Sequence, residues 1–347
     1  MATTTEGTGK GSADNVLPKL LNGVAKIENV PSLSKVSERL GEATVEFHVA
    51  KNGTDWADGA TGSPTYPFST IQGAVDYAEA NVEGDLAYVV NVHPGFYPET
   101  VVLSRPKVHV RGTHSYNDMT MFCAVSKIEI NCTQDMGGVN NTQYAVSGML
   151  VSPGSGDCVT VGGNTACTVI LKDCNLYADN SGQRCLVSSN LASPKLKVNG
   201  VIFNNILANA SGVNFASGWL DLQRCFFYSG DAESVIFSGS ALTMDGVLMQ
   251  TSGSDVLSAS GSGQLSVSNC LFETSKANAD GISLAGTVTC TMVQNVFRVP
   301  NGSGYAVNGV AGCVLVHGLN CYLPTYNNRI KSAMTVVAAT TTPTSAA

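Results

Sequence analysis

The chain has 347 residues, of which 19 are lysine or arginine and 26 are aspartate or glutamate, giving a formal net charge of −7. Charged residues make up 13% of the chain, about half the share of ordinary domains, whereas glycine occurs 36 times and hydrophobic residues reach 44%. This balance argues against a disordered chain and against a nucleic-acid-binding protein, which needs a basic surface. Few charges and many glycines favour an all-β protein with numerous tight turns.

The first 45 residues differ in character from the rest of the chain. Met1–Asn15 is polar and lacks the apolar core of a signal peptide, and no later segment has the 18 apolar residues of a membrane span. We therefore expect a protein made in a cytosol, without a membrane partner. Val16–Leu40 has the apolar spacing of a short amphipathic helix, interrupted by Pro31. Residues 1–45 are interpreted as an arm that either covers the main domain or docks on a partner.

A helix is predicted to begin near residue 71. Ser69 or Thr70 is a suitable N-cap, because a hydroxyl accepts a hydrogen bond from an unpaired amide of the first turn. Four apolar residues of the following segment share one helical face: Ile71, Ala74, Val75 and Ala78. The pattern predicts a helix that packs this face against the rest of the domain.

From residue 144 onward, apolar residues recur at positions i, i+2, i+5 and i+7 of successive repeats. The sets are Tyr144-Val146-Met149-Val151, Val169-Leu171-Cys174-Leu176, Leu196-Val198-Val201-Phe203, Leu220-Leu222-Cys225-Phe227, Leu242-Met244-Val247-Met249, Leu265-Val267-Cys270-Phe272 and Val314-Val316-Leu319-Cys321. Residues 290–297 repeat the pattern in a less clear register. The repeats begin 22 to 27 residues apart, and a period of this length is typical of a solenoid.

The phase within each repeat identifies the kind of solenoid. Apolar residues two apart predict a strand with one buried face, and the odd step from i+2 to i+5 requires a bend. Most residues in that step are types that tolerate a left-handed backbone: Gly148, Asp173, Gly200, Arg224, Asn269 and Gly318. A third apolar strand precedes each unit, as at Val159–Val161. Three short strands per coil predict a parallel β-helix over residues 46–334, followed by a low-complexity tail over residues 335–347.

The 11 cysteines lie between Cys123 and Cys321 without the paired spacing of a zinc site. We expect reduced, buried thiols that pack as small apolar side chains. Cys174, Cys225 and Cys270 share position i+5 in alternate coils, so their sulfurs should lie about 9–10 Å apart, too far for a disulfide.

Three segments resemble the opening of right-handed parallel β-helix proteins of the pectin-lyase-like superfamily: FHVAKNGTD, PFSTIQGAVDYA and VVNVHPGFYPETVVL. The resemblance implies a first strand, a helix that caps the open end of the solenoid, and then the first of about ten coils. The composition also resembles that of phage spike and virion decoration proteins. The sequence lacks the catalytic motifs of the superfamily's pectin methylesterases, polygalacturonases and pectate lyases, and nothing in it indicates a cofactor or metal.

Position i+6 falls between two buried positions, so its side chain should face outward. In four consecutive coils this residue is apolar: Ile202, Phe226, Leu248 and Leu271. Stacked apolar residues on a surface indicate an interface, here between subunits, unless a loop or terminal arm covers them. Position i+1 in the same coils carries Lys197, Asp221, Thr243 and Ser266.

These observations favour a virion structural protein over an enzyme. The interpretation is a phage head decoration, cement or short spike protein, a homotrimer on the virion surface that is made in the host cytoplasm. Residues 1–45 would attach it to a major capsid or tail protein. The alternatives are a polysaccharide-degrading lyase or hydrolase and a non-catalytic glycan-binding module. Trp219, Tyr177 and Tyr228 are the candidate glycan contacts, because aromatic rings stack on sugars.

Overall fold

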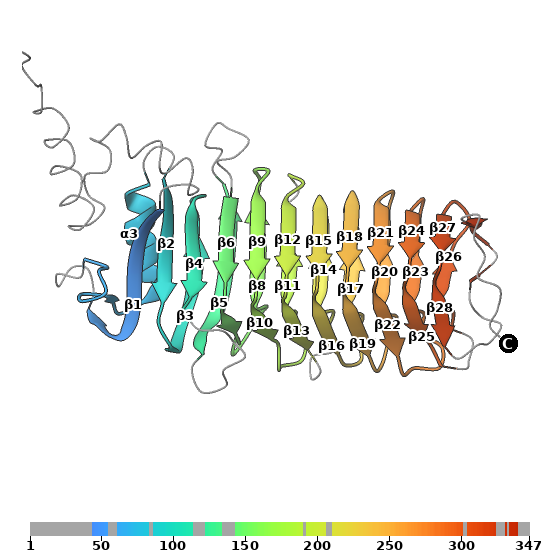
Figure 1. Ribbon diagram of the computed structural model, residues 1–347, viewed down its shortest axis with the longest axis horizontal. Helices are drawn as coiled ribbons and strands as arrows, with labels where there is room; N and C mark the ends of the chain where they lie inside the picture. The colour runs from blue at the N-terminus through green and yellow to red at the C-terminus, as the bar shows by residue number, and fades with distance from the viewer. Residues whose placement is uncertain are drawn as a thin grey trace, which may run out of the picture.

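The computed structural model places the described part of the chain in one elongated solenoid (Figure 1). The residues that the structure describes are 44–54, 61–82, 86–113, 122–133, 143–189, 192–205, 210–300, 304–323, 330–331 and 333–338. Nearly all of the predicted N-terminal arm, including Val16–Leu40, therefore lies outside the described residues.

One long sheet, here called sheet A, takes one strand from each coil, and its neighbouring strands pair in parallel. Its strands in spatial order are β1 (Thr44–Thr54), β2 (Ala87–Val92), β4 (Val108–Gly112), β6 (Gln143–Ser147), β9 (Thr168–Lys172), β12 (Lys195–Asn199), β15 (Trp219–Gln223), β18 (Ala241–Asp245), β21 (Gln264–Ser268), β24 (Thr289–Val293), β27 (Val314–Gly318) and β29 (Thr335–Ala338). β29 pairs with β27, so the β-helix includes the first four residues of the segment predicted as a tail.

The second sheet, sheet B, contains the other strands of each coil. They are β3 (Gly95–Leu103), β5 (Cys123–Cys132), β7 (Leu150–Val151), β8 (Val159–Gly163), β10 (Asn175–Tyr177), β11 (Leu186–Ser188), β13 (Ile202–Asn205), β14 (Val213–Phe215), β16 (Phe226–Ser229), β17 (Val235–Phe237), β19 (Leu248–Thr251), β20 (Leu257–Ala259), β22 (Leu271–Thr274), β23 (Ile282–Leu284), β25 (Val296–Arg298), β26 (Val307–Gly309) and β28 (Cys321–Leu323). The predicted all-β, parallel β-helix is confirmed. From β6 onward the described residues form about eight turns. The predicted count of about ten coils is not confirmed.

The interior is built from the predicted apolar positions. In the coil of β15 and β16, Leu220, Leu222, Cys225 and Phe227 are all at most 1% exposed. Equivalent residues stack from coil to coil, and the rings of Phe203 and Phe227 lie 4.3 Å apart at an angle of 8°. These stacked side chains form the continuous core that holds the coils together.

The bends between β-strands of sheets A and B have a left-handed backbone in successive coils. The φ angles lie between 50° and 65° at Gly148, Asp173, Gly200, Arg224, Gly246, Asn269, Gln294 and Leu319. The prediction was wrong by one residue in the last repeat, where Leu319 rather than Gly318 takes the bend. There Leu315 is buried and Leu319 is 51% exposed, the reverse of the predicted pattern. Val314, Leu315 and Val316 are all apolar, so alternation alone does not show which of them faces inward.

The predicted helix is present as α3 (Ile71–Ala80), at the N-terminal end of the solenoid (Figure 1). The Thr70 hydroxyl accepts a hydrogen bond from the amide of Gly73, as expected of an N-cap. The carboxylate of Glu99 in β3 accepts two more, from the amides of Ile71 and Gln72, each at 2.9 Å. α3 buries its predicted apolar face and contacts β1 to β4; that it caps the open end stays a prediction. No helix in the described residues combines the length and apolar character needed to cross a membrane.

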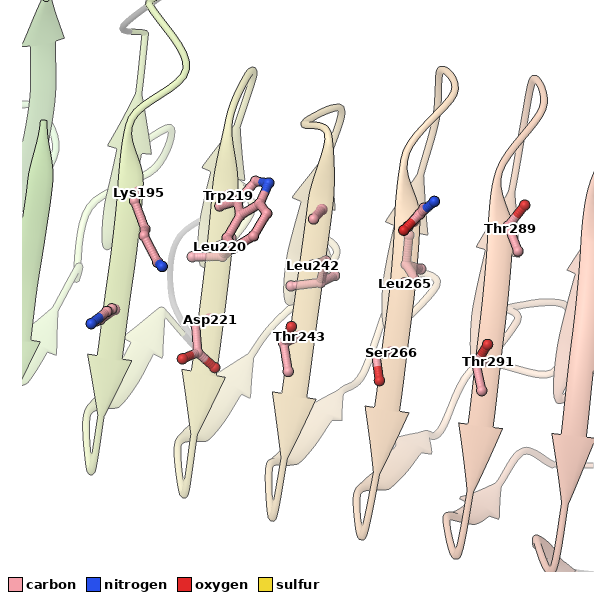
Figure 2. Close-up of a pocket in the computed structure, with 13 residues that line it drawn as sticks. Lys195, Trp219, Leu220, Asp221, Leu242, Thr243, Leu265, Ser266, Thr289 and Thr291 are labelled. Atoms are coloured by element: carbon pink, nitrogen blue, oxygen red, sulfur yellow. The ribbon is translucent and has the colours of Figure 1, made fainter. Parts of the chain in front are cut away.

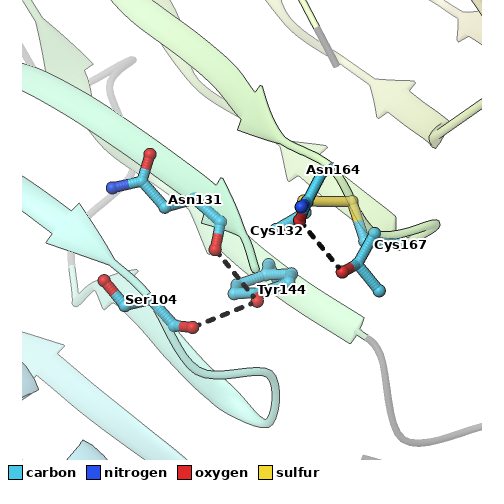
Figure 3. The surroundings of a disulfide bond; sticks show 7 residues. Ser104, Asn131, Cys132, Tyr144, Asn164 and Cys167 are labelled. Atoms are coloured by element: carbon cyan, nitrogen blue, oxygen red, sulfur yellow. Dashed lines mark hydrogen bonds between the residues drawn. A yellow bond between two sulfur atoms is a disulfide. The ribbon is translucent and has the colours of Figure 1, made fainter. Parts of the chain in front are cut away.

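The cysteines behave as predicted except at Cys321 and at one bonded pair. Cys321 is free but exposed, because the shifted register of the last repeat places it at an outward position. Cys174, Cys225 and Cys270 are free and buried. Cys132, at the end of β5, forms a disulfide with Cys167, which precedes β9, so the expectation of reduced thiols was wrong for these two residues (Figure 3). They are 35 residues apart in the sequence and meet only because the solenoid brings the two coils together. Nearby, the Tyr144 hydroxyl lies 3.4 Å from the Ser104 and Asn131 carbonyl oxygens.

Candidate functional site

The outer face of sheet A carries an open groove with a volume of about 660 Å³. It crosses five neighbouring strands, β12, β15, β18, β21 and β24, and therefore runs along the axis of the solenoid (Figure 2). At about 4.8 Å per strand spacing, these strands span about 19 Å. A site of this length accommodates a linear ligand of several sugar rings.

Two columns of outward-facing side chains form the floor of the groove, because residues two apart on a strand face the same side. The first column is Lys195, Trp219, Ala241, Gln264 and Thr289, and the second is Lys197, Asp221, Thr243, Ser266 and Thr291. The leucines between the columns point into the core, as Leu220 shows with 1% exposure. The floor thus changes from cationic at β12 to hydroxyl-rich at β21 and β24.

Trp219 is the large aromatic residue of the groove and is 54% exposed. The Nζ atom of Lys195 lies 4.8 Å from the centroid of its ring, a cation–π contact that restrains the indole on that side. On the other side the next residue of the column is Ala241, whose methyl group is too short to cover the ring. The indole therefore borders open space in the groove, bounded beyond Ala241 by Gln264.

The carboxylates near the groove do not form an acid–base pair. Asp221 is the carboxylate among the lining residues, and it accepts a hydrogen bond from Gln223 Nε2 at 3.2 Å. Asp245 lies at the end of the next strand, where Asn269 and Ser268 each donate to it at 2.8 Å. These two hydrogen bonds lower the pKa of Asp245, so it is ionised at neutral pH and is a poor proton donor. Glycoside hydrolysis by two carboxyl groups needs one with a raised pKa. Asp245, with its lowered pKa, does not meet this requirement.

The structure separates the three aromatic residues that the sequence analysis grouped as candidate glycan contacts. Trp219 lies in the groove on sheet A, whereas Tyr177 and Tyr228 lie half-buried on sheet B. Asn204 stands between the two tyrosines in the register of β10, β13 and β16. One sugar chain lying in the groove would therefore meet Trp219 and neither tyrosine.

The residues predicted as a subunit interface form a column on sheet B, called here the apolar column: Ile202, Phe226, Leu248 and Leu271. Phe226 is 39% exposed, and the other three are half-buried beside one another. Their inward-facing neighbours, such as Phe227, are fully buried, as the alternation predicts. That another subunit covers this column stays a prediction.

The sequence did not show where the groove lies or which residues besides Trp219 line it. Lys197, Asp221, Thr243 and Ser266 were noted only as the polar residues of position i+1, since threonine and serine on an outer strand face look like ordinary solvated surface. The available signal was the exposed Trp219 with Ala241 in the next coil. Across the described ranges, no group of three or more histidine, cysteine, aspartate and glutamate side chains is placed to hold a metal ion.

No protein-family model and no curated protein matches the chain. Among solved structures, it is similar to a pectin methylesterase from Aspergillus niger, at 13% identity and a TM-score of 0.44 over 86% of this chain and 93% of that one. A mannuronan C-5 epimerase A-module from Azotobacter vinelandii matches at 12% identity and a TM-score of 0.39, over 75% and 94% of the two chains. A pectin methylesterase from Erwinia chrysanthemi matches at 10% and 0.37, over 84% and 92%. None of these three is a phage protein. At such values they bring no activity or active-site residue to this chain.

Proposed function

We propose that the protein is a carbohydrate-binding β-helix and that an extended glycan lies along the groove on sheet A. The observation that carries this proposal is the exposed indole of Trp219 beside the open position above Ala241. A flat apolar ring at the edge of a polar groove suits a sugar, whose ring faces are apolar and whose edges carry hydroxyl groups.

The polar residues of the groove indicate how such a glycan is oriented. Thr243, Ser266 and Thr291 present hydroxyl groups one strand spacing apart, and a hydroxyl can donate or accept a hydrogen bond with a sugar. Lys195 and Lys197 lie at the other end and favour an acidic group on the ligand, because ammonium–carboxylate hydrogen bonds are the stronger kind. The proposed ligand is thus a linear glycan with an acidic group near β12.

The experiment is a glycan-array screen of the full chain, followed by calorimetric titration of the best oligosaccharide. Replacing Trp219 by alanine should weaken binding by about 30-fold, since loss of a central aromatic contact costs about 2 kcal/mol. Tyr228→Ala is the matched control, an aromatic truncation on the opposite sheet, and should bind like the unmodified protein. Equal affinity of the Trp219→Ala variant would place the ligand elsewhere. Release of reducing sugars or unsaturated products would show an enzyme instead of a binding module.

A second candidate function rests on a different observation, the apolar column on sheet B. We propose that this column is the contact between subunits of a homotrimer, because stacked apolar residues of this extent are typical of protein interfaces. In this proposal the trimer lies on a virion surface, attached through residues 1–45 to a capsid or tail protein, where the groove can contact host glycans.

Light scattering at micromolar concentration in reducing buffer tests the trimer. The proposal predicts three times the chain mass of 36.0 kDa for the unmodified protein. Phe226→Asp should yield the monomer, because a carboxylate would be desolvated in the interface. Thr243→Asp, an equivalent change on the outer face of sheet A, should leave the trimer intact. A trimer that survives Phe226→Asp would refute the placement of the interface.

A further inference from the structure

Two histidines meet at the N-terminal end of the solenoid, away from the groove. The Nδ1 atom of His48, in β1, lies 3.0 Å from the Nε2 atom of His93, which directly follows β2. The ring centroids are 5.3 Å apart and the ring planes are tilted by 35°. Both residues are half-buried, and neither has a role in the proposed glycan site.

Main-chain contacts fix this approach. β1 and β2 pair in parallel, with His48 opposite Asn91. The amide of His93 donates to the carbonyl of Val49 at 2.9 Å, and the Tyr97 hydroxyl donates to the carbonyl of His93 at 3.1 Å. Because the backbone is held on both sides, the two imidazoles are brought together by the fold before any ligand arrives.

The separation of the two nitrogens fits a particular coordination geometry. Two nitrogens that each lie 2.0–2.1 Å from a metal are about 2.9 Å apart when the angle between them is 90°, and about 3.3 Å apart at the tetrahedral angle. The observed 3.0 Å is close to the first value. Right-angled nitrogen ligands are typical of tetragonal Cu(II) and Ni(II), and Cu(II) binds such sites more tightly.

We propose that His48 and His93 are adjacent ligands of a Cu(II) ion. In the metal-free protein one ring donates an N–H to the other. When the metal binds, the donor ring carries this proton on its other nitrogen, so that both facing nitrogens present a lone pair to Cu(II). Among the described residues these two are the protein ligands, and water or an external ligand would complete the coordination. Imidazole is the most frequent side-chain ligand of such metals.

The surrounding charges do not oppose a cation. Glu46 of β1 and Arg111 of β4 form an ion pair at 3.2 Å, so the guanidinium charge is offset by a carboxylate. Asn91 connects them, donating to Glu46 at 3.0 Å and accepting from Arg111 at 2.8 Å. Glu46 acts on His48 more strongly than Arg111 does, so this ion pair does not repel a cation at the His48 side.

The test is a titration of the full chain with copper(II) chloride at neutral pH, followed by calorimetry and electron paramagnetic resonance. One tightly bound Cu(II) per chain with hyperfine coupling to two nitrogens is expected. His48→Ala and His93→Ala should each weaken Cu(II) binding by at least about 10–100-fold, which is the usual cost of losing a residue that only hydrogen-bonds a metal ligand. His317→Ala, which removes a half-buried histidine at the other end of the solenoid, should bind as the unmodified protein does. Unchanged binding by the first two variants would overturn the proposal.

A second measurement needs no variant and so does not depend on folding of a mutant. Cu(II) should protect His48 and His93, but not His317, from modification by diethyl pyrocarbonate, as read by peptide mass spectrometry. Equal modification of all three histidines with and without Cu(II) would refute the site.

Discussion

The aromatic stack inside the solenoid makes a quantitative prediction for Phe227. Its side chain is fully buried, stacks on Phe203 at 4.3 Å, and lies opposite Met249 in the next coil. A phenylalanine buries roughly 150–250 Å², worth about 4–6 kcal/mol at 25 cal/mol per Å², and phenylalanine-to-alanine changes in cores cost about 3–5 kcal/mol. We expect Phe227→Ala to lower the free energy of unfolding by about 4 kcal/mol.

The next residue of the same strand is the matched control. Tyr228 is also aromatic but faces outward and is half-buried, so Tyr228→Ala should cost about 1 kcal/mol or less. The assay is unfolding in guanidinium chloride, monitored by far-ultraviolet circular dichroism. The free energies of unfolding of the two variants are compared with one common slope of free energy against denaturant concentration. Because each coil contacts only its neighbours, a lower slope for Phe227→Ala would indicate that the solenoid unfolds in parts. Equal losses for the two variants, within about 1 kcal/mol, would refute the inward and outward assignment of β16.

Three further predictions concern buried polar groups and sulfur. Asn295 has a fully buried amide side chain that forms hydrogen bonds with backbone groups of the preceding coil at 2.9 and 3.0 Å. Asn295→Ala should therefore lower the free energy of unfolding by about 2–4 kcal/mol. An unchanged denaturation midpoint would contradict this. Burial raises the pKa of the Cys174 and Cys225 thiols to about 11. These neutral thiols therefore stabilise the folded state fully below the unfolded thiol pKa of about 8.5, and this stabilisation is lost as the pH rises toward 11. Urea unfolding across that window should show a fall in stability that is smaller in a Cys225→Val variant, and a flat profile would refute it. Replacing both Cys132 and Cys167 by serine should lower the free energy of unfolding by about 3–4 kcal/mol, because the disulfide closes a loop with a sequence separation of 35. Equal thermal midpoints of the variant and the unmodified protein would contradict this.

The fold was predictable because its core repeats. Residues such as Leu220 and Leu222 alternate with more exposed neighbours, and the same alternation returns in successive coils. Each coil therefore gives independent support for the same assignment of inward-facing residues. The alternation disappears at Val314–Val316, where all three residues are apolar, and there the predicted register is wrong. There the backbone of the preceding coil, through the pairing of Cys290 with Leu315, decides which residue faces inward.

The sites were less predictable because they depend on contacts between coils. Trp219 was named from the sequence only as one of three candidate glycan contacts. Its exposure and its open neighbour Ala241 became visible only with the structure and the register of β15 and β18. His48 and His93 are 45 residues apart, and no local pattern connects them. The same is true of the bridge between Cys132 and Cys167.

The direction of the hydrogen bonds in this solenoid has a mechanical consequence. The strands lie across the long axis, so the bonds between neighbouring coils point along it (Figure 1). A pulling force applied at the two ends would load successive coils in series, and the weakest coil would peel away first while the others stay intact. A force applied across the axis would instead load the bonds of a coil together, as in shear. The disulfide between Cys132 and Cys167 holds the two coils that it joins together, so these coils would resist peeling. Under such a force the chain would extend only outside residues 132–167.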